Sequence, residues 1–263
     1  RRAPRATWTL TMICNQSKRA AATDGARFDL LYSKGVFQVI KRNGRITALV
    51  GNYGSGKTEI ALNMALALKQ SSASKVMLVD LDIVNPYFRS AAQRELLTAH
   101  GIELEQPSFA LTTVDIPALP ASILRIFERK DLEVIIDLGG NDTGAAALGQ
   151  YKPHLDREGC DLLYVINARR PLSTNADDII EMMAEIQGRA RVPITGLINN
   201  TNLQNETTGQ DVIDGQKVIE EVSARTGIPI RAVVSTADVI EKLPDELKAR
   251  AFPIERKMEI EWL

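Results

Sequence analysis

The stretch Gly51-Asn52-Tyr53-Gly54-Ser55-Gly56-Lys57-Thr58 decides how this chain is expected to fold. It matches the pattern Gly-x-x-x-x-Gly-Lys-Ser/Thr that marks a phosphate-binding loop. The apolar run Ile46–Val50 enters the loop as a buried strand would, and a segment with helical apolar spacing leaves it at Glu59. A plain glycine-rich turn would not account for Lys57 and Thr58 at a helix start. We therefore interpret the stretch as a nucleotide site.

Each part of the loop has an expected contact with a nucleotide. The glycines let successive backbone N–H groups point at anionic oxygens, and the helix that follows directs its positive end at the same place. Lys57 is expected to act in catalysis by reaching the β- and γ-phosphates, and the Thr58 hydroxyl is expected to help bind Mg²⁺. The residues predicted to bind the nucleotide are Gly51, Asn52, Tyr53, Gly54, Ser55, Gly56, Lys57, Thr58, Gly140 and Asn199.

The composition is that of an ordinary globular chain. It has 263 residues, of which 44% are hydrophobic and 25% charged, and the net charge of −1 argues against nucleic acid as the main partner. The two cysteines stand far apart and in no metal-ligand spacing, which suits a reducing compartment, so we expect a cytoplasmic protein. No apolar run approaches the length of a membrane-spanning helix.

The first residues differ from the rest in composition. Residues 1–22 carry five basic and no acidic side chains and show little apolar periodicity. Such a start can be an organellar transit peptide, but it lacks a clear amphipathic helix. We therefore expect residues 1–26 to be a disordered or non-native extension, and residues 27–263 to form a single nucleotide-binding domain.

Apolar strand-like runs alternate with helical patterns along the remaining chain. This rhythm predicts an α/β protein with the three-layer P-loop NTPase fold, in which helices cover both faces of a mostly parallel sheet. The expected strands are 46–50, 76–79, 132–136, 162–166, 194–198 and 230–234, with a further edge strand within 27–42. The expected helices are 57–69, one from Asn85-Pro86 to Gly101, one after Pro117 and Pro120, one after a cap at Ser173 or Thr174, 211–226 and 238–251.

Polar residues follow these strands at the edge of the sheet where ligands bind. Asp137 is predicted to hold Mg²⁺ through water, and Gly140 to offer its N–H to a γ-phosphate. Asp82, or Asp80 beside it, could orient or deprotonate an attacking water, and we favour Asp82 as the catalytic residue. The alternative for each carboxylate is a capping role without chemistry.

The identity of the base is inferred partly from what is missing. No Asn-Lys-x-Asp guanine reader follows the late strands, whereas Asn199 or Asn200 offers an amide that can pair with adenine. ATP with Mg²⁺ is therefore the expected cofactor pair. Arg169 and Arg170 could meet a phosphate or a partner, although arginines beside a proline are usually solvated.

Four motifs resemble those of the MinD/ParA-like group of P-loop proteins, which also includes the cobyrinic acid amidoligases and dethiobiotin synthetase. They are the phosphate loop, Val79-Asp80-Leu81-Asp82, Ile135-Ile136-Asp137-Leu138-Gly139-Gly140 and Leu197-Ile198-Asn199. The resemblance spans about residues 46–251. It implies a Mg²⁺-dependent ATPase with Lys57 and Thr58 in the loop, Asp82 near the water, Asp137 near the metal and Asn199 near adenine.

One departure from that group concerns its signature lysine, which follows the first loop glycine and acts across an ATP-sandwiched dimer. Here Asn52 holds that position, and Tyr53 replaces a glycine, so a homodimer is possible but not implied. The segment Asp80-Leu81-Asp82-Ile83-Val84-Asn85-Pro86-Tyr87-Phe88-Arg89 most resembles an uncharacterised bacterial nucleotide-binding branch of the group.

Three functions remain open. The first is an ATP-hydrolysing switch that acts on an unknown protein partner. The second is an ATP-dependent synthetase, such as an amidoligase, or a small-molecule kinase, in which Tyr87, Arg89 or Arg169 would contact a substrate. The third is a protein that binds nucleotide without hydrolysing it. The tail 254–263 fits either an edge strand or a helix, and its three glutamates argue against a membrane-binding helix.

Overall fold

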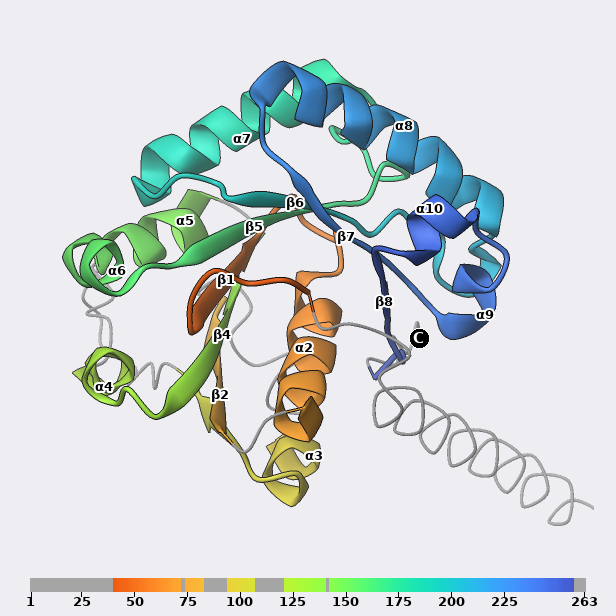
Figure 1. Ribbon diagram of the computed structural model, residues 1–263. Helices are drawn as coiled ribbons and strands as arrows, with labels where there is room; N and C mark the ends of the chain where they lie inside the picture. The colour runs from red at the N-terminus through yellow and green to blue at the C-terminus, as the bar shows by residue number, and fades with distance from the viewer. Residues whose placement is uncertain (1–39, 72–73, 83–93, 107–120, 141, 258–263) are drawn as a thin grey trace, which may run out of the picture.

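The described residues form one eight-stranded sheet in which all neighbouring strands pair in parallel (Figure 1). The computed structural model describes residues 40–71, 74–82, 94–106, 121–140 and 142–257. The strand order is β3-β2-β4-β1-β5-β6-β7-β8. The strands are β1 (Ile46–Val50), β2 (Lys75–Leu81), β3 (Ile102–Glu105), β4 (Leu132–Leu138), β5 (Asp161–Ile166), β6 (Gly196–Asn199), β7 (Ile230–Ser235) and β8 (Ala251–Pro253).

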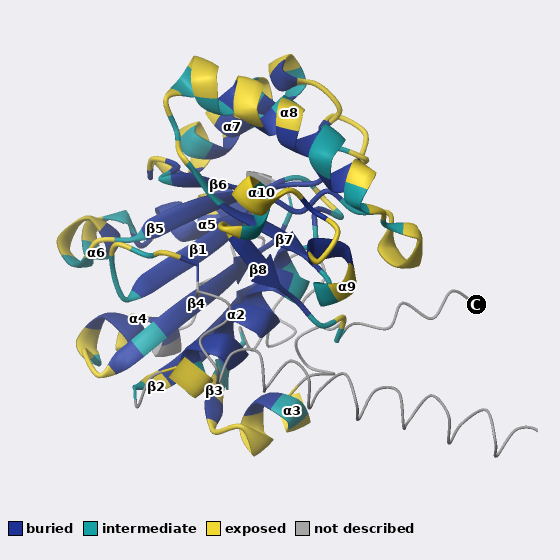
Figure 2. Ribbon diagram, turned by 45° about the vertical axis from the view of Figure 1, so that its right-hand side comes forward, coloured by how far each residue is buried: buried dark blue, intermediate teal, exposed yellow. Residues whose placement is uncertain are grey.

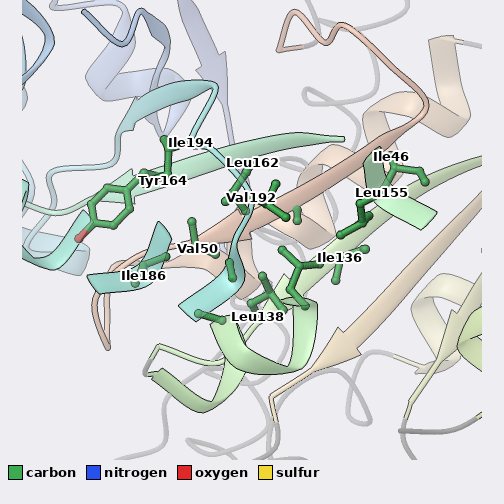
Figure 3. Packing of buried hydrophobic residues seen from close by; sticks show 14 of the residues in the cluster. Ile46, Val50, Ile136, Leu138, Leu155, Leu162, Tyr164, Ile186, Val192 and Ile194 are labelled. Carbon is green, nitrogen blue, oxygen red and sulfur yellow. The ribbon is translucent and has the colours of Figure 1, made fainter. Parts of the chain in front are cut away.

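The central strands are apolar on both sides because both faces of the sheet are covered. Successive side chains of a strand point to opposite faces, so Ile46, Ala48 and Val50 join one hydrophobic cluster and Leu49 joins the other. Figure 3 shows part of the first cluster, in which side chains of β1 and β4 such as Val50 and Leu138 lie close together. The sheet is therefore the middle of three layers.

Helices form the two outer layers (Figures 1 and 2). Helices α2 and α3 contribute their buried side chains to the cluster on one face, and α4 to α7, together with Ile219 and Val222 of α8, contribute to the cluster on the other. This confirms the predicted fold. The helices are α2 (Lys57–Ser71), α3 (Arg94–Ala99), α4 (Ala121–Glu128), α5 (Asp142–Gly149), α6 (Lys152–Glu158), α7 (Ala176–Ala190), α8 (Gly209–Thr226), α9 (Ala237–Ile240) and α10 (Asp245–Lys248), with a 3₁₀ turn η1 (Gln204–Glu206).

Several elements differ from the sequence predictions. The predicted helix 238–251 is wrong, because Pro244 lacks the N–H that a continuing helix needs and the chain forms α9, α10 and the edge strand β8 instead. The strand β3 and the helices α5 and α6 were not predicted. Asn175, rather than Ser173 or Thr174, caps α7, and its side chain accepts a hydrogen bond from the Asp178 N–H.

Some predictions lie outside the described residues. They are the extension 1–26, most of the edge strand expected within 27–42, the helix start at Asn85-Pro86, the side chains of Tyr87 and Arg89, and the end of the tail from 258. None of the helices in the described parts of the chain is both long and apolar enough to cross a membrane.

Candidate functional site

The predicted site residues other than Asn199 lie where β1, β2 and β4 end, at the start of α2 and just beyond β4. In a parallel sheet the carboxyl ends of all strands share one edge, so residues far apart in sequence converge there. The register places Asp80 of β2 directly beside Asp137 of β4, and Leu49 of β1 on the other side of Asp137. The loop from Gly51 to Gly56 follows β1 immediately.

Two glycines of the loop are required by close backbone contacts. Gly51 has φ 142° and Gly56 has φ 89°, both in a region that other residues rarely adopt. A Cβ on Gly51 would lie 2.3 Å from the Val165 carbonyl oxygen, and one on Gly56 would lie 2.3 Å from the Asn200 Nδ2 atom. The loop backbone is therefore held against β5 on one side and against the segment after β6 on the other.

Lys57 lies within the curve of the loop. Only 7% of its surface is exposed, and its ammonium group donates hydrogen bonds of 3.0 Å to the carbonyl oxygens of Gly51 and Asn52. A buried ammonium is expensive unless it is paired, so this position suits a group that binds anionic oxygens. The contact of Lys57 with phosphate oxygens stays a prediction.

Asp137 is the most unusual group of the site. It is 2% exposed, and its Oδ1 atom has no hydrogen-bond partner among the described residues. Burial and the neighbouring Asp80 carboxylate raise the pKa of Asp137 to about 7, whereas a hydrogen bond with the Thr58 side chain and the charge of Lys57 act in the opposite direction. A carboxylate in such a place is strongly favoured to meet a cation.

The donor atoms here fit a magnesium ion. The Thr58 hydroxyl and the carboxylates of Asp137 and Asp80 are oxygen ligands, and the partnerless Oδ1 atom of Asp137 provides a free ligand position. Among the described residues no three His, Cys, Asp or Glu side chains gather into a metal cluster. A cation bound here would therefore need further oxygens from water or phosphate, as Mg²⁺ in nucleotide sites does.

Asp82 and Gly140 also lie at this edge. The Asp82 N–H donates to the Asp80 carboxylate over 3.0 Å, and the charge of Asp82 helps to raise the pKa of Asp137. Asp80, Asp82 and Asp137 therefore lie near one another at this edge of the sheet. A Cβ on Gly140 would lie 2.8 Å from the Tyr53 Cα atom and 3.1 Å from the Lys57 Nζ atom. Gly140 thus packs directly on the phosphate loop, where no larger residue fits.

Asparagines fasten the loop to its surroundings, which the sequence did not reveal. The Asn52 amide donates to the Pro171 carbonyl oxygen over 2.8 Å and to the Ser173 hydroxyl over 3.3 Å. The Asn200 amide donates to the Ser55 carbonyl oxygen over 2.7 Å. The loop is therefore tied to the segments that follow β5 and β6.

Asn199, at the end of β6, is bonded within the protein. It is fully buried, and its amide donates to the Val212 carbonyl oxygen and to the Gln216 side chain of α8 while its oxygen accepts from the Thr201 N–H. These bonds use both amide protons and one lone pair of the oxygen. In this conformation Asn199 supports α8 and the loop after β6, and its contact with adenine stays a prediction.

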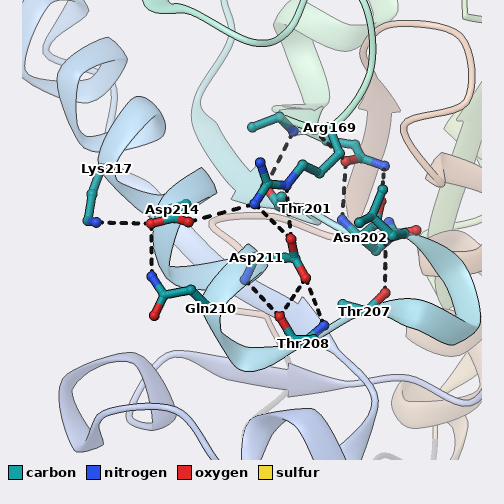
Figure 4. A network of polar contacts seen from close by, with 12 residues as sticks. Arg169, Thr201, Asn202, Thr207, Thr208, Gln210, Asp211, Asp214 and Lys217 are labelled. Carbon is teal, nitrogen blue, oxygen red and sulfur yellow. Dashed lines mark hydrogen bonds and ion pairs between the residues drawn. The ribbon is translucent and has the colours of Figure 1, made fainter.

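Two neighbouring arginines after β5 have different surroundings. Arg169 donates from Nε and Nη2 to one carboxylate oxygen of Asp211, which also forms the capping box of α8 with Thr208 (Figure 4). The bonds from Thr208 and the Arg169 guanidinium lower the pKa of Asp211. The Arg170 guanidinium instead lies along Gly54 of the phosphate loop.

Comparisons with known proteins find a matching family and similar solved structures. Residues 46–248 match the family model described as the CobQ/CobB/MinD/ParA nucleotide binding domain. No match is found among curated protein sequences.

Solved structures with a similar fold include chloroplast FtsY from Physcomitrella patens, with 19% identity, coverage of 74% of this chain and 60% of that chain, and a TM-score of 0.48. FlhF complexed with GTP and Mg²⁺ has 15% identity, coverage of 80% and 75%, and a TM-score of 0.47. The chain spans less than two thirds of the Physcomitrella protein. These identities and TM-scores are too low to transfer a function.

Proposed function

The chain belongs to the CobQ/CobB/MinD/ParA nucleotide-binding family, and from that premise we propose that it is a Mg²⁺-dependent ATPase that acts as a nucleotide-controlled switch for a partner protein. Membership of this family confirms the resemblance inferred from the four sequence motifs. Nucleotide binding by a P-loop domain is the part that the family itself supports. The choice of ATP, the hydrolysis and the switching are the proposal.

The observation that carries the proposal is the buried Asp137 carboxylate beside Thr58 and Lys57. Its Oδ1 atom has no partner among the described residues, although burial of an unpaired carboxylate oxygen is costly. A carboxylate with a purely structural role would be expected to have its lone pairs satisfied. The arrangement is favourable when a cation and a polyphosphate complete it.

Each residue then has a defined part in hydrolysis. Lys57 donates to oxygens of the β- and γ-phosphates, and the backbone of the loop surrounds them. Thr58 and Asp137 hold Mg²⁺, which when bound neutralises charge on the phosphates. Asp82 orients a water whose oxygen bonds to the γ-phosphorus while the bond to the bridging oxygen breaks. ADP leaves with that electron pair, and Asp82 passes the water proton to the released phosphate.

ATP is proposed over GTP because β6 ends in Asn199 and continues as Asn200-Thr201-Asn202, and these residues include neither the lysine nor the aspartate of a guanine reader. An adenine contact by Asn199 would require its amide to leave Val212 and Gln216. We therefore propose that Asn200, Thr201 and Asn202 contact the base of the nucleotide, and that Asn199 holds their backbone in position.

The switch is proposed from the contact between Gly140 and the phosphate loop. Gly140 immediately precedes the region of α5, and its backbone lies against Tyr53 and Lys57. A γ-phosphate held by Lys57 would meet the Gly140 N–H and fix the start of α5, whereas ADP would not. The partner is a protein that recognises one of the two states.

The test begins with nucleotide binding and turnover of the purified chain with ATP or GTP and Mg²⁺. Lys57→Ala is expected to lower turnover at least about 100-fold, because it removes the cation at the phosphates. Lys69→Ala is a matched control at the far end of the same helix, about 18 Å away at 1.5 Å per residue. Turnover that survives Lys57→Ala would contradict the site assignment.

Sedimentation with no nucleotide, ADP or a non-hydrolysable ATP analogue then tests the switch. A dimer that forms only with the analogue would support it and would direct the search to a protein partner. An unchanged oligomeric state with bound nucleotide, together with turnover that rises with a metabolite, would instead favour the synthetase or kinase alternative.

A further inference from the structure

Arg170 lies against the middle of the phosphate loop, although it comes from a different part of the chain. A Cβ on Gly54 would lie 3.3 Å from the Arg170 Nε atom, 3.4 Å from Cζ and 3.7 Å from Nη2. Three atoms of one guanidinium at similar distances from this position mean that the planar group packs on Gly54. Arg170 is exposed, so its charged end remains free to turn toward a bound anion.

The backbone that carries Arg170 is held in place from two directions. The Arg170 N–H donates to the Asn167 carbonyl oxygen, and the Ser173 N–H donates to the Arg170 carbonyl oxygen, so the segment forms consecutive turns. The Asn52 amide then ties Pro171 and Ser173 to the phosphate loop itself. Leu172 has φ 59° in this segment, a conformation that a leucine rarely adopts and that tertiary contacts must maintain.

The adjacent Arg169 differs from Arg170 because its guanidinium is paired with carboxylates of the protein. Arg169 is paired with Asp211 over 2.7 Å and lies 3.7 Å from Asp214. Within the described part of the chain no carboxylate lies within ion-pair distance of Arg170, although it stands next to a site rich in acids. Among the described residues Arg170 is thus a cation beside the phosphate loop without an anion.

We propose that Arg170 supplies, within the same chain, a catalytic cation that contacts the β- or γ-phosphate of the bound nucleoside triphosphate. The proposal rests on the proposed function and adds to it a residue that touches the substrate. A guanidinium can donate two parallel hydrogen bonds to phosphate oxygens, which a lysine cannot do with the same geometry. As the bond to the bridging oxygen breaks, Arg170 stabilises the charge that develops there and itself neither gains nor loses a proton.

Asn52 links the segment that carries Arg170 to the phosphate loop. It occupies the position after the first loop glycine, and its side chain bonds to Pro171 and Ser173, on either side of Leu172. An asparagine is long enough to hold the Arg170 segment to the loop, and it brings no charge of its own. The cation of this part of the site therefore comes from Arg170.

The experiment compares the full chain with Arg170→Ala, Arg170→Lys and Arg157→Ala. Arg157 is an exposed arginine on α6 next to Glu158, which pairs with Arg45 just before β1, so Arg157 controls for charge at the opposite edge of the sheet. Single-turnover hydrolysis of ATP and GTP is measured with Mg²⁺. The affinities for mant-ADP, mant-GDP and the mant-labelled β,γ-imido triphosphate analogues are measured by fluorescence, and thermal melting confirms that each variant is folded.

Arg170→Ala is expected to lower the single-turnover rate at least about 100-fold, within the range known for catalytic arginines, and to change diphosphate affinity by less than about threefold. Arg170→Lys is expected to recover only part of the rate, and Arg157→Ala is expected to match the unaltered chain. A rate for Arg170→Ala within about threefold of the unaltered chain would overturn the proposal.

The two proposals fail in different ways. If the unaltered chain binds triphosphate but does not hydrolyse it, the ATPase proposal fails, and Arg170 is then judged by binding alone. In that case Arg170→Ala should lower the preference for the imido analogue over diphosphate about tenfold or more, as loss of one charge-assisted phosphate contact would. An unchanged preference would overturn the role of Arg170. Absence of any nucleotide binding would overturn both.

Discussion

Replacing Asp137 with asparagine is expected to stabilise the nucleotide-free protein above neutral pH and to weaken its binding of nucleotide with Mg²⁺. The carboxylate is 2% exposed, lies beside Asp80 and has an oxygen without a partner among the described residues. Asparagine keeps the size of the side chain but carries no charge, so it removes the cost of ionising this buried group. It also removes the ligand that a cation would use.

The magnitude follows from the pKa of Asp137, which burial and Asp80 raise from 3.8 to about 7. The folded protein therefore keeps a proton that the unfolded chain releases, and its stability falls as the pH rises from about 4 to about 7. Three pKa units at 1.36 kcal/mol each correspond to about 4 kcal/mol, an upper limit because the Asp80 charge adjusts as well. The asparagine variant would not lose this amount, so the advantage of Asp137→Asn should grow over that interval and level off above it.

Urea unfolding followed by circular dichroism at pH 5 and pH 8, with EDTA and without nucleotide, measures this difference. Asp245→Asn is a suitable control because its side chain is 99% exposed and should show no pH-dependent effect. With Mg²⁺ and ATP at 100 times the dissociation constant, the unaltered chain should gain about 2.7 kcal/mol and the variant less at the same concentration. A difference between variant and unaltered chain that is the same at both pH values would refute the reasoning.

Two further predictions concern packing near the site and can be checked by urea unfolding. Gly215→Ala should destabilise the protein by about 1–3 kcal/mol, because the new Cβ would lie 2.0 Å from the Oγ1 atom of the fully buried Thr201. Gly188→Ala should instead stabilise it by about 0.5–1 kcal/mol, because Gly188 lies in the exposed part of α7 and its new Cβ would have nothing within 4 Å. If both changes have the same sign, the packing argument is wrong. Asn63→Ala should cost about 1–3 kcal/mol and speed hydrogen exchange at Glu255, because the buried Asn63 amide bonds to both the N–H and the carbonyl oxygen of that residue. Unchanged exchange at Glu255 would contradict it.

The central fold could be predicted because its strands are buried on both faces. A run such as Ile46–Val50 has no exposed position, and only a parallel sheet between two helical layers accommodates several such runs. The strand β3 escaped prediction because Ile102-Glu103-Leu104-Glu105 is short, is half polar and lies at the sheet edge. The glycine- and alanine-rich segment of α5 shows no clear helical period of large apolar residues, so it gave no signal either.

The candidate site could be predicted only where a local motif defines it. Lys57 and Thr58 belong to a motif, and Asp137 directly follows a predicted strand, so their convergence follows from the topology of the sheet. The bonds of Asn199 to α8 could not be predicted, because a strand-end amide can face a ligand or a helix and its sequence position does not distinguish the two. The contact of Arg170 with Gly54 could not be predicted either, since it depends on the three-dimensional path of the segment after β5.

The replacement of the signature lysine by Asn52 thus need not remove a positive charge from the site. In the group that the sequence resembles, that lysine acts across an ATP-sandwiched dimer. Here the Asn52 side chain bonds to Pro171 and Ser173 of its own chain, and the segment that it holds places the Arg170 guanidinium along Gly54. A cation supplied in this way needs no second copy. Hydrolysis and dimerisation would then be separate properties of this protein, and a monomeric state would by itself be no argument against an ATPase.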